Sequence, residues 1–174
     1  SSFATIQATK SFNDWGKAQS FEFTLQAKDN APMPAEAKDG KVAKTVTDNA
    51  RTAVFGQIEY KSAGTYEYTI TETKGNAPGV TYDTTAHNVV VTVTKGEGNK
   101  LSTDVKYDEQ DALIITNTFK PTTATIEATK SFNDWGKAQS FTFDLAAVSA
   151  KDAQGGDIAG GAPMPTSSAA IATK

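Results

Sequence analysis

The chain has 174 residues, 38% of them hydrophobic and 21% charged, which suffices for one full domain or for one domain and a fragment. Its net charge is only −3, with Lys and Arg spread along the sequence, and this argues against a nucleic-acid-binding protein. No run of residues approaches the ~18 apolar residues that a membrane span needs, so we expect no membrane-spanning segment. Neither end carries a signal peptide or an anchor, so we expect a fragment of a longer protein.

Several kinds of chemistry lack the residues they need. The sequence has no Cys, which rules out disulfides, thiolate metal sites and cysteine nucleophiles. A single histidine, His87, leaves few metal or Ser-His arrangements, and its position indicates a strand end rather than a ligand. The acidic YDEQD at 107–111 lacks the spacing of a calcium loop and predicts a solvated hairpin. We therefore expect no metal, no cofactor and no ordinary enzyme.

Short runs rich in Thr, Val, Ile, Tyr and Phe, separated by turn signals, predict an all-β sandwich. The first expected strand covers 4–12, and the NDWGK at 13–17 predicts a hairpin-type turn into a second strand at 21–25. One face of the second strand carries Phe21, Phe23 and Leu25. Residues 35–53 are ambiguous, and we expect a loop there with room for one short element.

The later strands follow at similar intervals. They are expected at 54–60, 65–72, 86–94, 101–107 and 112–119. In the first of these, Val54, Ile58 and Tyr60 share one parity, with Gly56 between them. The GNAPG at 75–79 predicts a loop, and the KGEGNK at 95–100 predicts a hairpin turn rather than a phosphate-binding loop. No segment has a convincing helical period.

The sequence repeats itself with an offset of 120 residues. Residues 4–25 and 124–145 differ at only three positions, whereas the APMP at 31–34 recurs at 162–165, an offset of 131. The second copy therefore carries an insertion that is rich in Gly and Ala. We expect residues 1–120 to form one complete module and 121–174 to be a truncated second copy of it. Near-identical tandem copies favour a structural array over a duplicated domain of an enzyme.

Three polar residues fall on the core-facing parity of three different strands. Lys10 shares its face with Ile6, Ala8 and Phe12; Glu72 shares its face with Tyr68 and Ile70; Asn117 shares its face with Leu113, Ile115 and Phe119. Burying an unpaired charge costs several kcal/mol, so such residues are rare in a core unless they meet. Each one alone is explained as a strand-end residue, but the three together suggest one shared site.

Their chemistry is complementary. Burial favours a neutral lysine amine, which is a nucleophile, and a protonated carboxyl group, which can donate a hydrogen bond to an amide carbonyl. Asn117 then supplies the electrophilic amide, and Glu72 transfers the proton from the amine to the departing ammonia. The expected product is a Lys–Asn isopeptide bond, formed once without turnover. Because strand registers are inferred here, a bond from a different lysine to Asn117 remains open.

The motifs of residues 4–119 resemble those of the streptococcal pilin isopeptide linkage domain, the repeating shaft module of Gram-positive major pilins and related surface adhesins. The shared motifs are ATKSF, FxFxL, GTYEYTITE, YD before a VVVTV strand, and IITNTF. The resemblance implies an immunoglobulin-like β-sandwich of the collagen-adhesin B type, with an internal isopeptide bond joining the first and last strands. It implies that Lys10 and Asn117 form this bond and that Glu72 promotes it. It also implies the cell-wall-attached, extracellular surface of a Gram-positive bacterium.

The second copy keeps the matching lysine, Lys130, but ends before any equivalent of Glu72 or Asn117. We therefore expect Lys130 to stay unlinked and 121–174 to lack the strands of a closed sandwich.

Two functions follow from these observations. The first is a structural stalk module of a pilin or adhesin, with neighbouring repeat modules as its partners. The second is an adhesin module that binds a host glycan or protein, with Trp15 in the NDWGK turn as a candidate ligand contact. Packing of Trp15 at the end of the sandwich is the simpler explanation of that residue.

Overall fold

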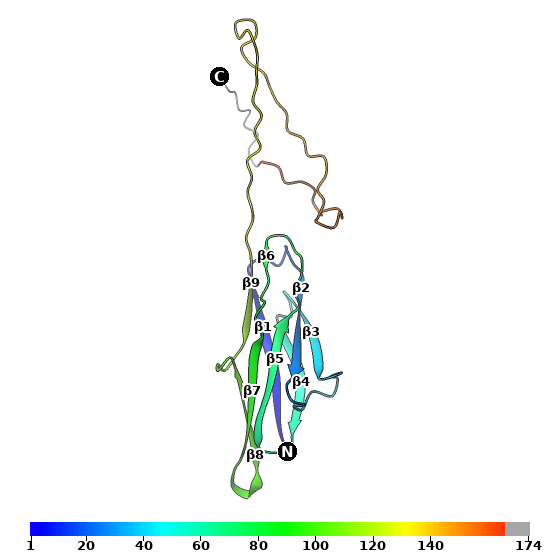
Figure 1. Cartoon of the computed structure of the whole chain (residues 1–174), viewed down its shortest axis with the longest axis vertical. Coiled ribbons are helices and arrows are strands. Elements are labelled where there is room, and N and C mark those ends of the chain that lie inside the picture. The colour runs from blue at the N-terminus through cyan, green and yellow to red at the C-terminus, as the bar shows by residue number, and fades with distance from the viewer. Residues whose placement is uncertain (166–174) are drawn as a thin grey trace. The chain divides into compact units, whose positions relative to one another are not determined.

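The computed structural model describes residues 1–165 and divides the chain into two units, Ser1–Thr122 and Thr123–Lys174. All strands that it describes lie in the first unit (Figure 1). They are β1 Ser2–Phe12, β2 Ser20–Ala27, β3 Lys41–Thr47, β4 Thr52–Tyr60, β5 Gly64–Glu72, β6 Val80–Thr81, β7 His87–Lys95, β8 Leu101–Tyr107 and β9 Ile114–Phe119. Within residues 1–165 the helical structure is one 3₁₀ turn, Glu97–Asn99, and no described helix is long and apolar enough to cross a membrane.

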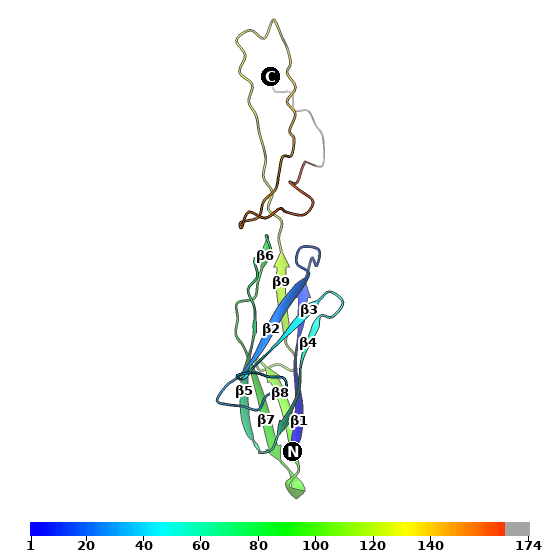
Figure 2. The same ribbon diagram turned by 90° about the vertical axis from the view of Figure 1, so that its right-hand side faces the viewer.

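The strands of the first unit form two sheets. The four-stranded sheet has the order β4-β1-β9-β6, and the five-stranded sheet has the order β3-β2-β5-β7-β8. Strands β1 and β9 are parallel neighbours, whereas the other pairs are antiparallel. Figures 1 and 2 show that the strands run lengthwise, so that the N-terminus lies at one end of this unit and β9 leaves it at the other. The first and last strands are therefore adjacent.

The core lies between the two sheets, because each strand turns alternate side chains inward. In β2, the inward residues Phe21, Phe23 and Leu25 are buried, as their alternation predicted. The valines of β7 and the tyrosines Tyr60 and Tyr68 belong to the same buried cluster. The prediction of an all-β sandwich is confirmed.

The parity predicted for 54–60 is wrong at its start. Val54 is exposed, and its neighbour Phe55 is fully buried together with Ile58 and Tyr60. The register of β1 against β4 shifts between Thr5 and Gln7, where β4 contains an extra residue next to Gly56, which has φ +109°. This β-bulge reverses the alternation, which a strict two-residue period cannot predict.

Two further connections differ from the predictions. The turn at 13–17 does not close a hairpin, because β1 and β2 belong to different sheets and this turn carries the chain from one to the other. The ambiguous stretch 35–53 contains a strand, β3, which pairs along β2 as the edge of the five-stranded sheet. The turn at 95–100 does join an antiparallel pair, β7 and β8, as expected.

The second unit differs from the first in its secondary structure. Between residues 123 and 165 the structure describes turns and one isolated bridge, Lys151 to Asp157, but no strand. It nevertheless contains an aromatic cluster in which Phe132, Trp135 and Phe141 meet edge to face, with ring centroids 5.0–5.6 Å apart. The Lys130 Nζ lies 4.3 Å from the centroid of the Phe141 ring.

Candidate functional site

Three strands bring the predicted polar residues together inside the sandwich. Lys10 lies on β1 and Asn117 on β9, where the parallel ladder pairs Lys10 with Ile115 and Phe12 with Asn117. Glu72 is the last residue of β5, in the opposite sheet. Because all three face the interior, the site spans the space between the two sheets.

Each of the three side chains is shielded from water. The exposed fractions are 1% for Lys10, 8% for Glu72 and 1% for Asn117, and these are the polar residues buried in the described part of the chain. The Glu72 Oε1 atom accepts hydrogen bonds from both Lys10 Nζ and the Asn117 side-chain Nδ2, the latter at 2.9 Å. One carboxylate oxygen therefore holds the amine of β1 and the amide of β9 side by side.

Aromatic rings complete the surroundings of the Lys10 amine. The Nζ atom lies 4.3 Å from the centroid of the Phe21 ring and 5.6 Å from that of Phe23. Burial lowers the pKa of Lys10 below its usual 10.5, and the carboxylates of Glu72 and Asp83 oppose this shift without cancelling it. Burial thus shifts the Lys10 equilibrium towards the neutral amine, which is the nucleophilic form.

Asp83 joins the site through its backbone, which the sequence analysis missed. Its N–H donates to Glu72 Oε2 at 2.8 Å and to Asn117 Oδ1 at 3.2 Å. The short pairing of β6 with β9, Val80 to Phe119 and Thr81 to Thr118, brings this segment alongside Asn117. Two polar atoms of the Asn117 amide are therefore held, the nitrogen by Glu72 and the oxygen by Asp83.

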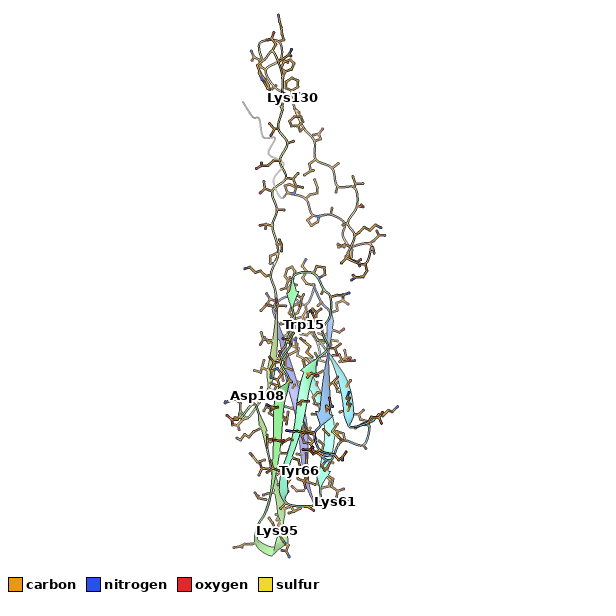
Figure 3. The ribbon with its side chains drawn as sticks, in the orientation of Figure 1. Trp15, Lys61, Tyr66, Lys95, Asp108 and Lys130 are labelled. Atoms are coloured by element: carbon orange, nitrogen blue, oxygen red, sulfur yellow. The ribbon has the colours of Figure 1, made fainter. Side chains whose placement is uncertain are left out.

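His87 lies behind Asp83, away from the amine. His87 is the first residue of β7, in agreement with its predicted place at a strand end. Its ring contacts two carboxylates: Nε2 lies 2.6 Å from Asp83 Oδ2, and Nδ1 lies 2.7 Å from Asp108 Oδ2. The 107–111 segment contains a tight turn closed by an antiparallel bridge between Tyr107 and Gln110, but it leads from β8 to β9 in the other sheet and so does not join two strands of one sheet. Figure 3 shows Asp108 on this turn. An Asp two residues before a Thr, as in Asp83–Thr85, is a turn signal that sequence reading could have used.

Trp15 packs at the end of the sandwich at which β1 ends (Figure 3). Its ring meets Phe12 and Phe21 edge to face, with centroids 5.6 and 5.4 Å away, and the Arg51 guanidinium lies 5.5 Å from its centroid. The Nε1 atom is buried without a hydrogen-bond partner among the described residues. Packing therefore accounts for Trp15 without a bound sugar.

No cluster of three or more His, Asp or Glu side chains suited to a metal ion occurs within residues 1–165.

Comparison with known proteins identifies the family. The model of the Spy0128-like isopeptide-containing domain (FctA) matches residues 6–120, about two thirds of the chain. No curated protein sequence matches at a significant level.

Among solved structures, the major pilin of Streptococcus pyogenes is 19% identical over 67% of this chain and 50% of its own, with a TM-score of 0.40. The major pilin T-13 of the same species is 19% identical over 69% of this chain and 53% of its own, also at 0.40. The chain spans about half the length of these pilins. The family model covers the strands β1 to β9 almost completely, including Lys10, Glu72 and Asn117. The chain belongs to the family of Spy0128-like isopeptide-containing domains, as its motifs predicted.

Proposed function

We propose that residues 1–120 form a stalk module of a Gram-positive surface pilin or adhesin, and that an isopeptide bond between Lys10 and Asn117 locks this module. The observation that carries the proposal is the shared contact of Lys10 Nζ and Asn117 Nδ2 with Glu72 Oε1 inside the core. The family match adds independent support, because its members are described as isopeptide-containing domains.

The reaction needs no cofactor and no oxidant. The neutral Lys10 Nζ attacks the Asn117 side-chain Cγ, a new Nζ–Cγ bond forms, and the Cγ–Nδ2 bond breaks. One proton passes from Nζ to Nδ2, so that ammonia leaves and the sum of atoms is unchanged. Glu72 Oε1 contacts both nitrogens and is placed to receive this proton from one and deliver it to the other.

Positioning supplies much of the rate. Fixing an amine and an amide in one buried site replaces a bimolecular encounter by an intramolecular one, which is worth about 7–11 kcal/mol of barrier. Burial lowers the pKa of Lys10 and so increases the share of the neutral amine, the form that can attack. The product stays in place, so the chain acts on itself once and is not an enzyme with turnover.

The bond suits a module that carries tension. Strands β1 and β9 are parallel neighbours, and Figure 1 shows the N-terminus and the end of β9 at opposite ends of the first unit. Tension between these ends would pass along β1, across the bond and out through β9, so the chain between Lys10 and Asn117 is bypassed. Closing this loop of about 107 residues also removes on the order of 4–5 kcal/mol of unfolded-state entropy, by analogy with a disulfide.

The second unit fits a repeat of the same module. Its Lys130, Phe132 and Phe141 reproduce the arrangement of Lys10, Phe12 and Phe21, including the 4.3 Å separation of the amine from the ring centroid. We propose that residues 121–174 belong to a second copy of the module. The natural partners of the first unit are then neighbouring modules of the same protein on the cell surface.

A tryptic digest tests the assignment of the bond. A linked Lys10 blocks cleavage after that residue, and trypsin does not cut between Lys120 and Pro121. The expected product is therefore peptide 1–17 joined to peptide 107–130, with fragmentation placing the bond between Lys10 and Asn117. Separate recovery of peptides 1–10 and 107–130 would refute the proposal. A bond to Asn117 from a different lysine would be compatible with the stalk function, but it would show that Lys10 is not the bond-forming residue.

A further inference from the structure

The hydrogen bond from Asp83 to the Asn117 side-chain oxygen points to a second requirement of the proposed reaction. When the Lys10 amine attacks Cγ, the carbonyl oxygen of the Asn117 amide acquires negative charge. A donor aimed at this oxygen in a dry site stabilises that charge, as in an oxyanion hole. The Asp83 N–H, which is shared between Glu72 Oε2 at 2.8 Å and Asn117 Oδ1 at 3.2 Å, is placed to do so.

This donor sits on a segment with no strand partner of its own. Residues 82–86, between β6 and β7, make no regular ladder, so contacts of the Asp83 side chain add to those of its N–H in fixing its position. Its Oδ1 accepts a hydrogen bond from the Thr85 N–H at 2.8 Å, and its Oδ2 lies 2.6 Å from His87 Nε2. His87 is in turn held by Asp108, which is itself fixed by a 2.9 Å hydrogen bond from the Asn88 N–H.

The geometry favours the protonated form of His87. Both ring nitrogens contact carboxylates, and an ionised carboxylate can only accept a hydrogen bond, so both nitrogens must donate. Only the imidazolium does so. Burial lowers the pKa of His87, but its hydrogen bonds to Asp83 and Asp108 outweigh burial and leave the pKa above the usual 6.5.

We propose that the Asp83 backbone N–H is the oxyanion donor of the Lys10–Asn117 reaction, and that protonated His87, bound between Asp83 and Asp108, positions this donor. Asp83 is the catalytic group, because it touches the reacting amide. His87 and Asp108 are positioning residues that act through Asp83. The inference rests on the proposed isopeptide bond and adds a pH-sensitive element to its formation.

The charged groups that face the His87 ring come from two loops. Asp83 precedes β7, and Asp108 follows β8; the register partner of His87 on β5 is Ile70, which is uncharged. Glu72 meets Asp83 at its backbone N–H, and the charges that raise the pKa of His87 are those of Asp83 and Asp108. The protonation of His87 therefore depends chiefly on Asp83 and Asp108.

The test follows the loss of ammonia over time at several pH values. Full-length chain is made by cell-free synthesis, quenched directly into denaturant so that it cannot react, and refolded by dilution. Intact mass gives the rate of bond formation, and circular dichroism of the same samples gives the rate of refolding. The His87→Gln variant keeps an uncharged donor at this position, and the ratio of the wild-type rate to the variant rate cancels the pH dependence that the two chains share.

We expect a ratio of about ten at pH 5.5, because a displaced donor costs rate out of proportion to its small movement. The ratio should fall towards one as the pH rises through the pKa of His87, with equal refolding rates in both chains. Asp108→Asn should move this midpoint to lower pH, because the imidazolium loses one anionic partner. Asp111→Asn is the matched control: it removes the same charge from the same turn, but Asp111 contacts Lys106, so the midpoint should not move.

A ratio that stays the same at every pH, or a midpoint unaffected by Asp108→Asn, overturns the inference. A slower reaction that only mirrors slower refolding also overturns it, since His87 would then be merely structural. If His87→Gln does not fold, the ratio of the wild-type rate to the Asp108→Asn rate decides instead: it should exceed one near the pKa of His87 and return to one well above it, whereas the same ratio for Asp111→Asn should stay at one at every pH. Absence of any mass loss in the wild type is a different failure, because it removes the isopeptide bond itself.

Discussion

Lys10 and Asn117 are diagonal neighbours on the inner face of two parallel strands. The ladder pairs Lys10 of β1 with Ile115 of β9, and Asn117 lies two residues further along the same face. The adjacency of these two strands places an amine beside an amide in a site that excludes water. This relationship is the basis of the predictions below.

Removal of Lys10 should destabilise the fold more than removal of Asn117. Neither Lys10→Ala nor Asn117→Ala can form the bond, but Lys10→Ala also leaves the Glu72 carboxylate buried without its cationic partner. We expect the free energy of unfolding in urea to be about 3 kcal/mol lower for Lys10→Ala than for Asn117→Ala. The double variant Lys10→Met/Glu72→Gln removes both charges and should recover most of that difference. Equal stabilities of the two single variants would show that the pair does not matter in the folded state.

The stabilising contribution of His87 should depend on pH in a defined direction. Its pKa in the folded chain is raised, so its contribution is complete below the unfolded value near 6.5 and is lost as the pH rises through the folded pKa. Burial raises the pKa of Asp83, but hydrogen bonds from His87 and Thr85 outweigh burial and hold it below 3.8. The contribution of Asp83 is therefore complete above 3.8 and is lost as the pH falls through its folded pKa.

These shifts can be measured in the Asn117→Ala background, where no bond forms. His87 is the only histidine in the sequence, so its ring protons give one unambiguous NMR titration. The stability advantage over Asn117→Ala/His87→Gln should be present at pH 5.5 and absent well above the NMR midpoint. A midpoint below 6.5, or an advantage that grows with pH, contradicts the prediction.

Trp15 should tolerate Phe better than Ala. Its Nε1 is buried without a hydrogen-bond partner, so Trp15→Phe removes an unsatisfied donor while it keeps a ring against Phe12 and Phe21. We expect Trp15→Phe to change the free energy of unfolding by less than about 1 kcal/mol, and Trp15→Ala to lower it by about 2 kcal/mol because this ring is only partly buried. Urea denaturation in the Asn117→Ala background measures both. A large loss in Trp15→Phe would mean that the indole nitrogen has a partner in solution.

Force spectroscopy should separate the linked chain from an unlinked one. When the wild type is pulled from its two ends, the loop from Lys10 to Asn117 cannot extend, whereas in Asn117→Ala it can. The variant should therefore show an additional extension of roughly 350 Å or more, since about 107 residues are released at about 3.3–3.6 Å each. The second unit is the same in both chains and serves as an internal control. The same long extension in the wild type would contradict the stalk function.

The sequence predicted the parts of this fold that depend on local alternation. The inward parity of β2, the long strands and the turn between β7 and β8 needed only a two-residue period and turn signals. The bulge at Gly56 was not predictable in this way, because one extra residue reverses the parity without changing the composition. The sequence of the turn at 13–17 also could not show that β1 and β2 belong to different sheets, because hairpins and crossings between sheets use similar turn residues.

The candidate site was predictable only in part, for a related reason. Lys10, Glu72 and Asn117 stand out because a polar side chain on a core-facing parity breaks the pattern of its strand. Asp83 contributes a backbone N–H, which every residue except proline has, so no side-chain pattern marks it. His87 looked like an ordinary strand end, because its two carboxylate partners come from loops that only the fold brings together.

The most direct test of the central claim is the intact mass of the purified chain, compared with that of its Glu72→Ala variant. If Lys10 and Asn117 join with loss of ammonia, the wild type is lighter than its sequence by about 17 Da, and Glu72→Ala has its full mass because the proton cannot be transferred. A wild type of full mass would contradict the account, since the buried Lys10, Glu72 and Asn117 would then be a structural cluster and not a reactive one.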